Sequence, residues 1–161
     1  MAQKQANFKE QLAFGVEGEH IIGQLLLNRG VTLLPLYQFD NHDKAPLIHG
    51  QNMQRAAPDL TCFKDGRAYF VEVKSKREWE RYTGKLETGI DMNAFEAYQA
   101  IKKATGLKVF LFFRHIEDPP EGIYYAEVDQ YTRYWDGKNK QGKQRHVPTY
   151  WYNIEVLSSL H

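Results

Sequence analysis

Two β-rich runs joined by a tight turn are the feature of the sequence that most constrains its fold. The runs cover residues 59–63 and 67–74, and both contain the β-branched and aromatic residues typical of strands. Lys64-Asp65-Gly66 separates them. An Asp-Gly pair between such runs favours the left-handed backbone conformations of a two-residue hairpin turn. The sequence therefore predicts an antiparallel β-hairpin.

The turn decides which side chains of the hairpin face each other. If Asp65-Gly66 is the whole turn, counting back along both strands places Asp59 directly opposite Glu72. Because side chains alternate between the two faces of a strand, Glu72 and Lys74 then share a face. A three-residue loop would shift the register by one and turn Glu72 to the other face, unless a bulge compensated.

Two carboxylates in such positions need a positive charge between them. Directly opposed side chains have Cβ atoms only about 4.5–5.5 Å apart, so Asp59 and Glu72 would repel each other. A divalent cation would remove the repulsion, and hard oxygen ligands suit magnesium or manganese. The alternative is that both residues and Lys74 lie on a solvated face. Against it, the residues around Glu72 are apolar on both faces of the strand, which predicts a buried strand.

A third carboxylate comes from the first predicted helix, over about residues 7–29. Apolar residues recur at helical spacing along it until Gly30 ends the pattern: Phe8, Leu12, Val16, Ile22 and Leu26. At about 100° per residue, Glu19 lies within this stripe and Glu17 on nearly the opposite side. Burying an unpaired carboxylate is costly, so a cation or strong hydrogen-bond donors should lie near Glu19. The alternative is that local hydrogen bonds satisfy it.

The rest of the chain predicts alternating strands, helix and loops. Pro35 argues for an edge position or a bulge in the first strand, and Asp91 and Gly106 are the expected caps of the second helix. The predicted segments are a strand at 31–39, an irregular polar stretch at 40–57, a charged loop at 75–90, a helix at 93–105, a buried strand at 107–114, a strand at 123–128, a basic loop at 136–146 and a last strand at 149–157.

Length and composition exclude several classes of protein. The 161 residues are enough for one domain with its own hydrophobic core. The single cysteine, Cys62, excludes an internal disulfide and a cysteine zinc cluster, which fits a reducing cytoplasm. No apolar run reaches the length of a membrane span. The sequence has no glycine-rich phosphate loop, which argues against an ATPase. A net charge of +1 leaves any attraction to nucleic acid to local basic clusters.

Pro58-Asp59 followed by Glu72-Val73-Lys74 resembles the motif that names the PD-(D/E)xK nuclease superfamily. Glu19, four residues after Gly15, resembles the first helix of archaeal-type Holliday junction resolvases and related phage nucleases. The order of elements over about 7–114 is similar to the superfamily's α-β-β-β-α-β core. The resemblance implies an α/β, restriction-endonuclease-like core with a central mixed sheet flanked by helices, plus a C-terminal β-rich extension over about 115–161, all in a single domain.

The same resemblance implies a Mg-dependent endodeoxyribonuclease, in which Mn2+ could substitute. Asp59, Glu72 and the backbone carbonyl of Val73 would bind one or two ions, and Glu19 a second ion or a metal-bound water. Lys74 would orient the attacking water or stabilise charge on the transition state. The substrate would be duplex or branched DNA in recombination, repair or phage DNA processing. The segment after Asp118 does not resemble the resolvases, so the junction substrate and a homodimer are left open.

A basic and aromatic run follows the second hairpin strand and suits phosphate contacts and base stacking. The residues expected to bind nucleic acid are Lys76, Arg77, Arg81, Tyr82 and Lys85. The alternative for this run is a packed lid. The rival function for the whole chain is a catalytically inactive nucleic-acid-binding module with the same fold.

Overall fold

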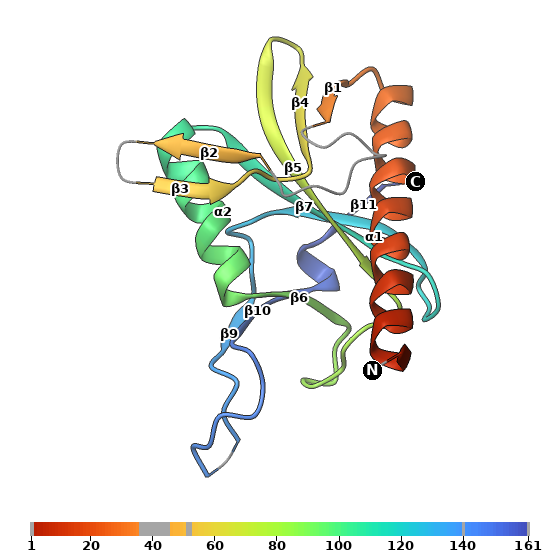
Figure 1. Cartoon of the computed structure of the whole chain (residues 1–161), viewed down its shortest axis with the longest axis vertical. Helices are drawn as coiled ribbons and strands as arrows, with labels where there is room; N and C mark the ends of the chain where they lie inside the picture. Colours follow the sequence, from red (N-terminus) through yellow and green to blue (C-terminus); the bar gives the residue numbers. More distant parts are fainter. Residues whose placement is uncertain (1, 36–45, 51–52, 140, 161) are drawn as a thin grey trace.

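The molecule is built around a six-stranded mixed sheet with the two long helices on its opposite sides (Figure 1). The computed structural model describes residues 2–35, 46–50, 53–139 and 141–160, and for 2–12 and Pro35 it describes the backbone alone. Within these residues, neither helix combines the length and the apolar character that a membrane crossing requires. The sheet has the strand order β1-β4-β5-β7-β8-β11. Its strands are β1 (Thr32–Pro35), β4 (Leu60–Lys64), β5 (Arg67–Lys76), β7 (Lys108–His115), β8 (Gly122–Glu127) and β11 (Ser158–Leu160).

The predicted hairpin is confirmed, with the register that a two-residue turn requires. Lys64 pairs with Arg67 and Leu60 with Val71. Asp65 and Gly66 both have positive φ angles, of 51° and 73°, as the tight Asp-Gly turn demands. β5 then continues beyond its antiparallel partner β4 and pairs in parallel with β7 as far as Lys76.

Each helix covers one face of the sheet with its own hydrophobic core. α1 (Ala2–Asn28) packs against the face that carries Val71 and Val73. α2 (Met92–Thr105) packs against the face of Phe70, which lies with Ile101 in the second core. β5 is thus covered on both sides, as its apolar residues predicted. Alternation along β5 leaves Glu72 and Lys74 on the α2 face.

The helix ends and the edge strand follow the sequence signals. Asp91 caps α2 by accepting a hydrogen bond from the Ala94 N–H at 2.8 Å, and Gly106 ends it in the left-handed conformation. β1 is an edge strand, as Pro35 indicated. On α1, Ile22 and Leu26 are buried, whereas Phe8 and Leu12, predicted for the same stripe, lie outside the described side chains.

Two sequence predictions were wrong because they treated strands as loops. The polar stretch at 46–57 contains a hairpin of β2 (Leu47–Gly50) and β3 (Met53–Ala56) that packs near α2; residues 36–45 of the predicted strand and loop lie outside the described residues. The charged loop at 75–90 ends in β6 (Glu87–Asp91). β6 joins β10 (Thr149–Asn153) and β9 (Arg133–Trp135) in a second sheet.

The last predicted strand, at 149–157, is in fact divided. β10 ends at Asn153, a 3-10 turn covers Ile154–Val156, and β11 then returns to the edge of the central sheet beside β8. The segment between β9 and β10 projects from the body at the lower end of the view (Figure 1). These late strands therefore build both sheets.

A close contact between α1 and β5 sets the position of the helix. The Gly18 backbone lies so near β5 that a Cβ atom there would stand 2.1 Å from the Ser75 Oγ. The nearest Val73 methyl would be at an ordinary contact distance of 3.6 Å. The Ser75 hydroxyl is buried and has no hydrogen-bond partner among the residues that the structure describes. Glycine inside a helix costs about 1 kcal/mol relative to alanine, so this glycine is used for the close approach that also brings Glu19 to the sheet.

We expect Gly18→Ala to destabilise the fold by about 1–3 kcal/mol through overpacking, measured by urea unfolding. Ser75→Ala removes the clashing hydroxyl, so the double variant should recover most of the loss, a non-additive result diagnostic of contact. Gly15→Ala is the control: no atom lies within 4 Å of its added Cβ, so it should be neutral or stabilising. Equal losses for Gly15 and Gly18 would contradict the close approach.

Candidate active site

Asp59 and Glu72 meet where β5 passes the beginning of β4. The β4–β5 register ends at Leu60 and Val71, so the next residues on the two strands are these two acids. Asp59 is held by the Val73 N–H, which donates to its Oδ2 at 2.7 Å. Glu72 is only 6% exposed. The hairpin thus brings together the two carboxylates that its turn predicted.

The surroundings of Asp59 favour its neutral form in the absence of a cation. Burial, then the negative charge of Glu72 and, less strongly, that of Glu19, raise the pKa of Asp59 to about 8, although the Val73 N–H and Lys74 act in the opposite direction. An acid held neutral by a dry site and a like charge is typical of functional positions. A divalent ion beside Asp59 would favour its ionised form.

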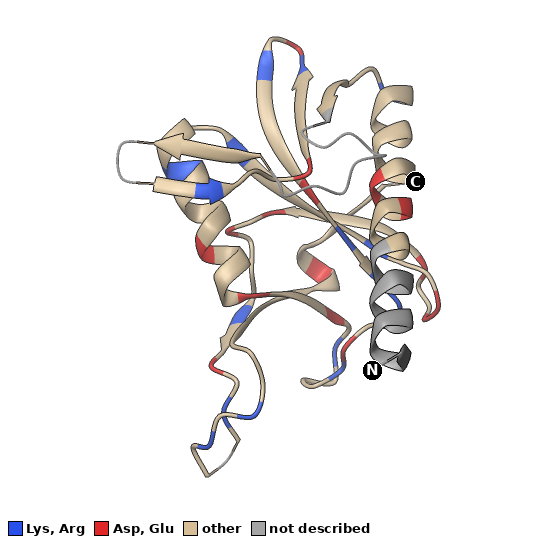
Figure 2. Ribbon diagram, viewed as in Figure 1, with Lys and Arg blue, Asp and Glu red and all other residues tan. Residues whose placement is uncertain are grey.

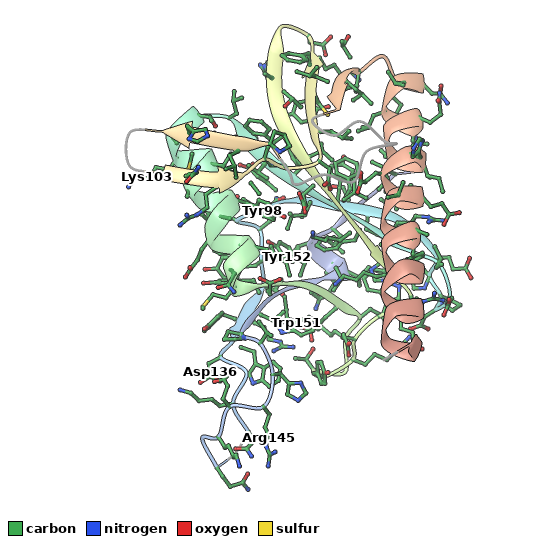
Figure 3. All side chains as sticks on the ribbon, viewed as in Figure 1. Tyr98, Lys103, Asp136, Arg145, Trp151 and Tyr152 are labelled. Carbon is green, nitrogen blue, oxygen red and sulfur yellow. The ribbon has the colours of Figure 1, made fainter. Side chains whose placement is uncertain are left out.

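Glu72 is held by two donors from different elements. The Lys74 Nζ forms an ion pair with the Glu72 Oε1 at 2.5 Å. Burial lowers the pKa of Lys74, but the Glu72 carboxylate outweighs it, and the net shift is upward, so Lys74 carries its charge. From α2, the Tyr98 hydroxyl donates to Glu72, and burial with these acids raises the pKa of that phenol. Tyr98 lies between α2 and the central strands (Figure 3).

The Tyr98–Glu72 hydrogen bond is the functional contact that the sequence did not reveal. Phe95, Tyr98 and Ile101 are all buried, so the helical stripe was interpreted correctly as core. Periodicity shows which side of a helix is buried but not what a hydroxyl on that side reaches. A polar tip on a core tyrosine was the available signal, since buried phenols usually find a partner.

Glu19 and Glu17 lie as the helical projection predicted. Glu19 is half-buried and near enough to Asp59 for its charge to affect the Asp59 pKa. Glu17 is exposed and pairs with Arg114 at 3.1 Å. Among the described residues, however, no three His, Cys, Asp or Glu side chains converge closely enough to hold a metal ion. The preformed donor set is therefore Asp59 and Glu72, with Glu19 beyond them.

This donor set fits magnesium. The ion commonly uses one or two carboxylates and keeps several waters, and the two acids present are hard oxygen ligands in a buried, mutually repelling pair. The backbone carbonyl of Val73 lies on the same strand, between Glu72 and Lys74. Its role as a ligand remains a prediction.

The comparisons with known proteins agree with this architecture. No protein-family model and no curated protein matches the sequence. Among solved structures, one match is Archaeoglobus fulgidus Hjc, a Holliday junction resolvase from an archaeal hyperthermophile, at 13% sequence identity, a TM-score of 0.55, and coverage of 88% of this chain and 85% of that one. The chain has a restriction-endonuclease-like fold. At this identity the likeness shows the fold alone.

Most of the residues predicted to bind nucleic acid form ion pairs with carboxylates of this chain. Arg77 pairs with Glu117, and Arg81 contacts both oxygens of Asp118, at 2.6 and 2.8 Å. Lys85 pairs with Glu155 at 2.8 Å. Tyr82 is 65% exposed and meets the Trp151 ring edge-on. The packing favours the alternative of an ordered lid, with an exposed aromatic ring at its tip.

Lys76 lies deeper than a phosphate-binding surface residue. It is half-buried, and burial, followed by the neighbouring charge of Lys74, lowers its pKa. Its parallel partner His115 is buried, stacks on Trp79 with ring centroids 3.6 Å apart, and has no hydrogen-bond partner on either ring nitrogen within the described part of the chain. Burial lowers the pKa of His115 to about 4, with Lys76 adding to the shift, so this imidazole is neutral.

We expect Asp59→Asn to stabilise the metal-free protein at alkaline pH. The folded-state pKa of Asp59 lies above its unfolded value, so its contribution to stability is present at low pH and is lost as pH rises through about 8. The variant carries no charge to bury. In EDTA, its unfolding free energy should match wild type near pH 4, exceed it by a growing margin between about pH 4 and pH 8, and level off at an excess of several kcal/mol above about pH 8.

Thermal melts with added Mg2+ complete this test. The ion should raise the melting temperature of wild type more than that of Asp59→Asn. Asp65→Asn, in the exposed hairpin turn, is the control that should respond like wild type. A stabilisation by Mg2+ equal in wild type and Asp59→Asn would contradict the assignment of Asp59.

Proposed function

We propose that this protein is a metal-dependent nuclease that hydrolyses phosphodiester bonds in DNA. The observation that carries the proposal is the pair formed by half-buried Asp59 and buried Glu72, linked to Lys74 and Tyr98, on a restriction-endonuclease-like fold. Asp59 and Glu72 would hold the ion, which would supply Lewis-acid activation of water and neutralise charge developing on the phosphate. Magnesium is the proposed cofactor, with manganese able to replace it.

Each residue of the site has a separate task in this proposal. The Val73 N–H orients the Asp59 carboxylate, and its carbonyl is offered as a further ligand. Lys74 orients the attacking water or stabilises charge on the phosphate, because its ammonium group is charged and lies beside the ligand Glu72. Tyr98 is a positioning residue that fixes Glu72 from α2. Glu19 acts from outside the pair, through a second ion or a metal-bound water.

DNA contacts are proposed on two sides of this centre. The lid after β5 offers Tyr82 for stacking, together with Arg77, Arg81 and Lys85 if DNA displaces their carboxylate partners. The projecting segment between β9 and β10 carries Lys and Arg at the lower end of Figure 2, including exposed Lys143 and Arg145. Branched DNA of the Holliday junction type and a homodimer are part of the proposal, as is a cytoplasmic location, with Cys62 a buried free thiol.

Cleavage of supercoiled plasmid and of a panel of branched, single-stranded and duplex oligonucleotides tests the function. We expect cleavage with Mg2+ or Mn2+ and none in EDTA. Asp59→Asn and Glu72→Gln should lower the rate by about a hundredfold or more, because ion binding and charge stabilisation fail together. Lys74→Met should lower the rate while leaving Mg2+ binding detectable by calorimetry.

Two glutamates of α1, two residues apart in the chain, provide a variant of the site and its matched control. Glu19→Gln should slow cleavage, whereas Glu17→Gln, which removes only an exposed ion pair, should not. Gel shifts without cleavage by wild type under every metal condition would instead identify a nucleic-acid-binding module. Undiminished cleavage by Asp59→Asn would refute the site.

A further inference from the structure

Four aromatic rings from three segments of the chain lie side by side between the lid and the second sheet. The ring of Tyr82, in the lid, meets that of Trp151 on β10 edge-on, with ring centroids 5.6 Å apart. Its centroid is 6.2 Å from that of Trp135 on β9. Trp135 in turn lies 5.3 Å from the ring of His146, between β9 and β10. These four residues are called the aromatic row below.

The strand register places the two tryptophans of the row on one face of the second sheet. Trp151 pairs directly with Arg133 of β9. Two residues earlier on β10, Thr149 pairs with Trp135. Paired residues, and residues two apart on a strand, point to the same side of a sheet, and Arg133 indeed lies over the Trp151 ring at 5.1 Å. Tyr152 points to the opposite side, into the core against α2.

The row is buried at one end and exposed at the other. Trp151 is only 7% exposed, whereas Tyr82 is 65% exposed; Trp135 is half-buried and His146 exposed. The hydroxyl of Tyr82 hydrogen-bonds with Glu80, which holds the polar tip and leaves the ring at the surface. Aromatic rings that adjoin one another at the surface in this way indicate a binding site.

The outer end of the row belongs to an ordered arm, defined as residues 136–146 of the projecting segment. Gly137 has a φ of 78°, and a Cβ atom there would stand 2.1 Å from the carbonyl oxygen of His146, so only glycine permits this closure. The His146 N–H donates to the Gly137 carbonyl at 3.1 Å, and the Gln144 amide donates to the Asp136 carbonyl at 3.0 Å. A surface that is already ordered loses less conformational freedom on binding.

The charge of the arm favours a polyanion. Residues 136–146 include four Lys or Arg and one Asp, in a chain of net charge +1, and Figure 2 shows these cations at the lower end of the molecule. Lys143 and Arg145 are exposed. On the lid side, the carboxylate of Glu80 lies beside Tyr82 and would repel phosphate. Aromatic rings next to a line of cations are the usual combination for single-stranded nucleic acid, in which unpaired bases stack and phosphates meet the cations.

The buried end of the row lies beside the catalytic centre. Trp151 lines a pocket of about 310 Å³ together with Lys76 and Asp91. Lys76 is two residues beyond Lys74 on the same face of β5, and Asp91 is near enough to Lys74 for their charges to interact. Figure 3 shows Trp151 in the body of the molecule and Asp136 and Arg145 on the arm that projects from it. A strand lying along the row would therefore lead toward the catalytic carboxylates.

We propose that the aromatic row and the arm bind a single-stranded segment of DNA, with bases stacked on Tyr82 and Trp135 and phosphates beside Lys143 and Arg145. This inference rests on the proposed nuclease function and names its substrate class: DNA in which an unpaired strand adjoins the cut, such as a flap or a splayed end. The bases of a fully paired duplex are stacked on one another, so such a duplex meets only the cations of the arm.

Fluorescence anisotropy in EDTA tests the surface without cleavage. The probes are a dye-labelled oligothymidylate and a blunt hairpin duplex with the same dye. We expect wild type to prefer the single strand. Tyr82→Ala and Trp135→Ala should each weaken single-strand binding about tenfold, the effect of one lost stacking contact, with little change for the duplex. Tyr82→Phe keeps the ring and should bind like wild type.

Tyr134→Ala is the matched control. Tyr134 is 45% exposed and adjoins Trp135 on β9, but it pairs with Tyr150 and points to the opposite face, so its loss should leave single-strand binding unchanged. Lys143→Gln combined with Arg145→Gln should flatten the dependence of log affinity on log salt by about 0.7 for each lost phosphate contact. Melting curves establish that every variant is folded.

The outcomes separate this surface from the nuclease function. Equal affinity of wild type for both probes overturns the proposal, as does unchanged single-strand binding by folded Tyr82→Ala and Trp135→Ala. It is also overturned if these two variants dissociate a dimer in sedimentation while still binding the oligothymidylate, because the row is then an interface between copies of the chain. Cleavage of a flap substrate by wild type with Mg2+ is scored separately: no cleavage with an intact single-strand preference rejects the nuclease and retains the surface.

Discussion

The hydrogen bond from the Val73 N–H to Asp59 is the interaction on which the site depends. It exists because β4 stops pairing at Leu60 while β5 continues, so the backbone donor at Val73 meets a side chain instead of a strand. The Asp65-Gly66 turn, which ends seven residues before Val73, sets that register. A single added turn residue would move Glu72 to the α1 face, away from Tyr98. Local turn chemistry thus determines where two charges are buried.

Much of this could be predicted from the sequence because the signals are local. The turn conformation, the caps of α2 at Asp91 and Gly106, and the opposite orientations of Glu17 and Glu19 all depend on residues a few positions apart. The pairing of β6 with β10 does not depend on nearby residues, because β10 lies some sixty residues after β6 in the chain. β6 itself, Glu-Thr-Gly-Ile-Asp, is also short and mostly polar. The β2–β3 hairpin was missed although its pairing is local, because each strand is only four residues long and largely exposed, with no apolar alternation to mark it.

The partners of charged and hydroxyl groups could not be predicted from the sequence for a different reason. The basic run after β5 suggested a phosphate-binding surface, but its partners Glu117, Asp118 and Glu155 come from distant turns, and composition alone does not show such pairing. The Tyr98–Glu72 bond was hidden because a helical stripe indicates burial, not the target of a hydroxyl. The pocket beside Trp151 was equally hidden, since its walls belong to elements that only the tertiary structure brings together.

The length of β5 beyond β4 has one more consequence. Among the described residues, β5 has a strand neighbour on one side only, β7, from Glu72 to Lys76, and an unpaired margin of this kind can recruit a strand from another molecule. This margin of β5 begins with Glu72 and carries Lys74 and Lys76, and its Val73 N–H donates a hydrogen bond to Asp59. Inward-pointing charges are a common safeguard against intermolecular strand pairing. The acids and lysines of the site therefore also help to keep copies of this chain apart.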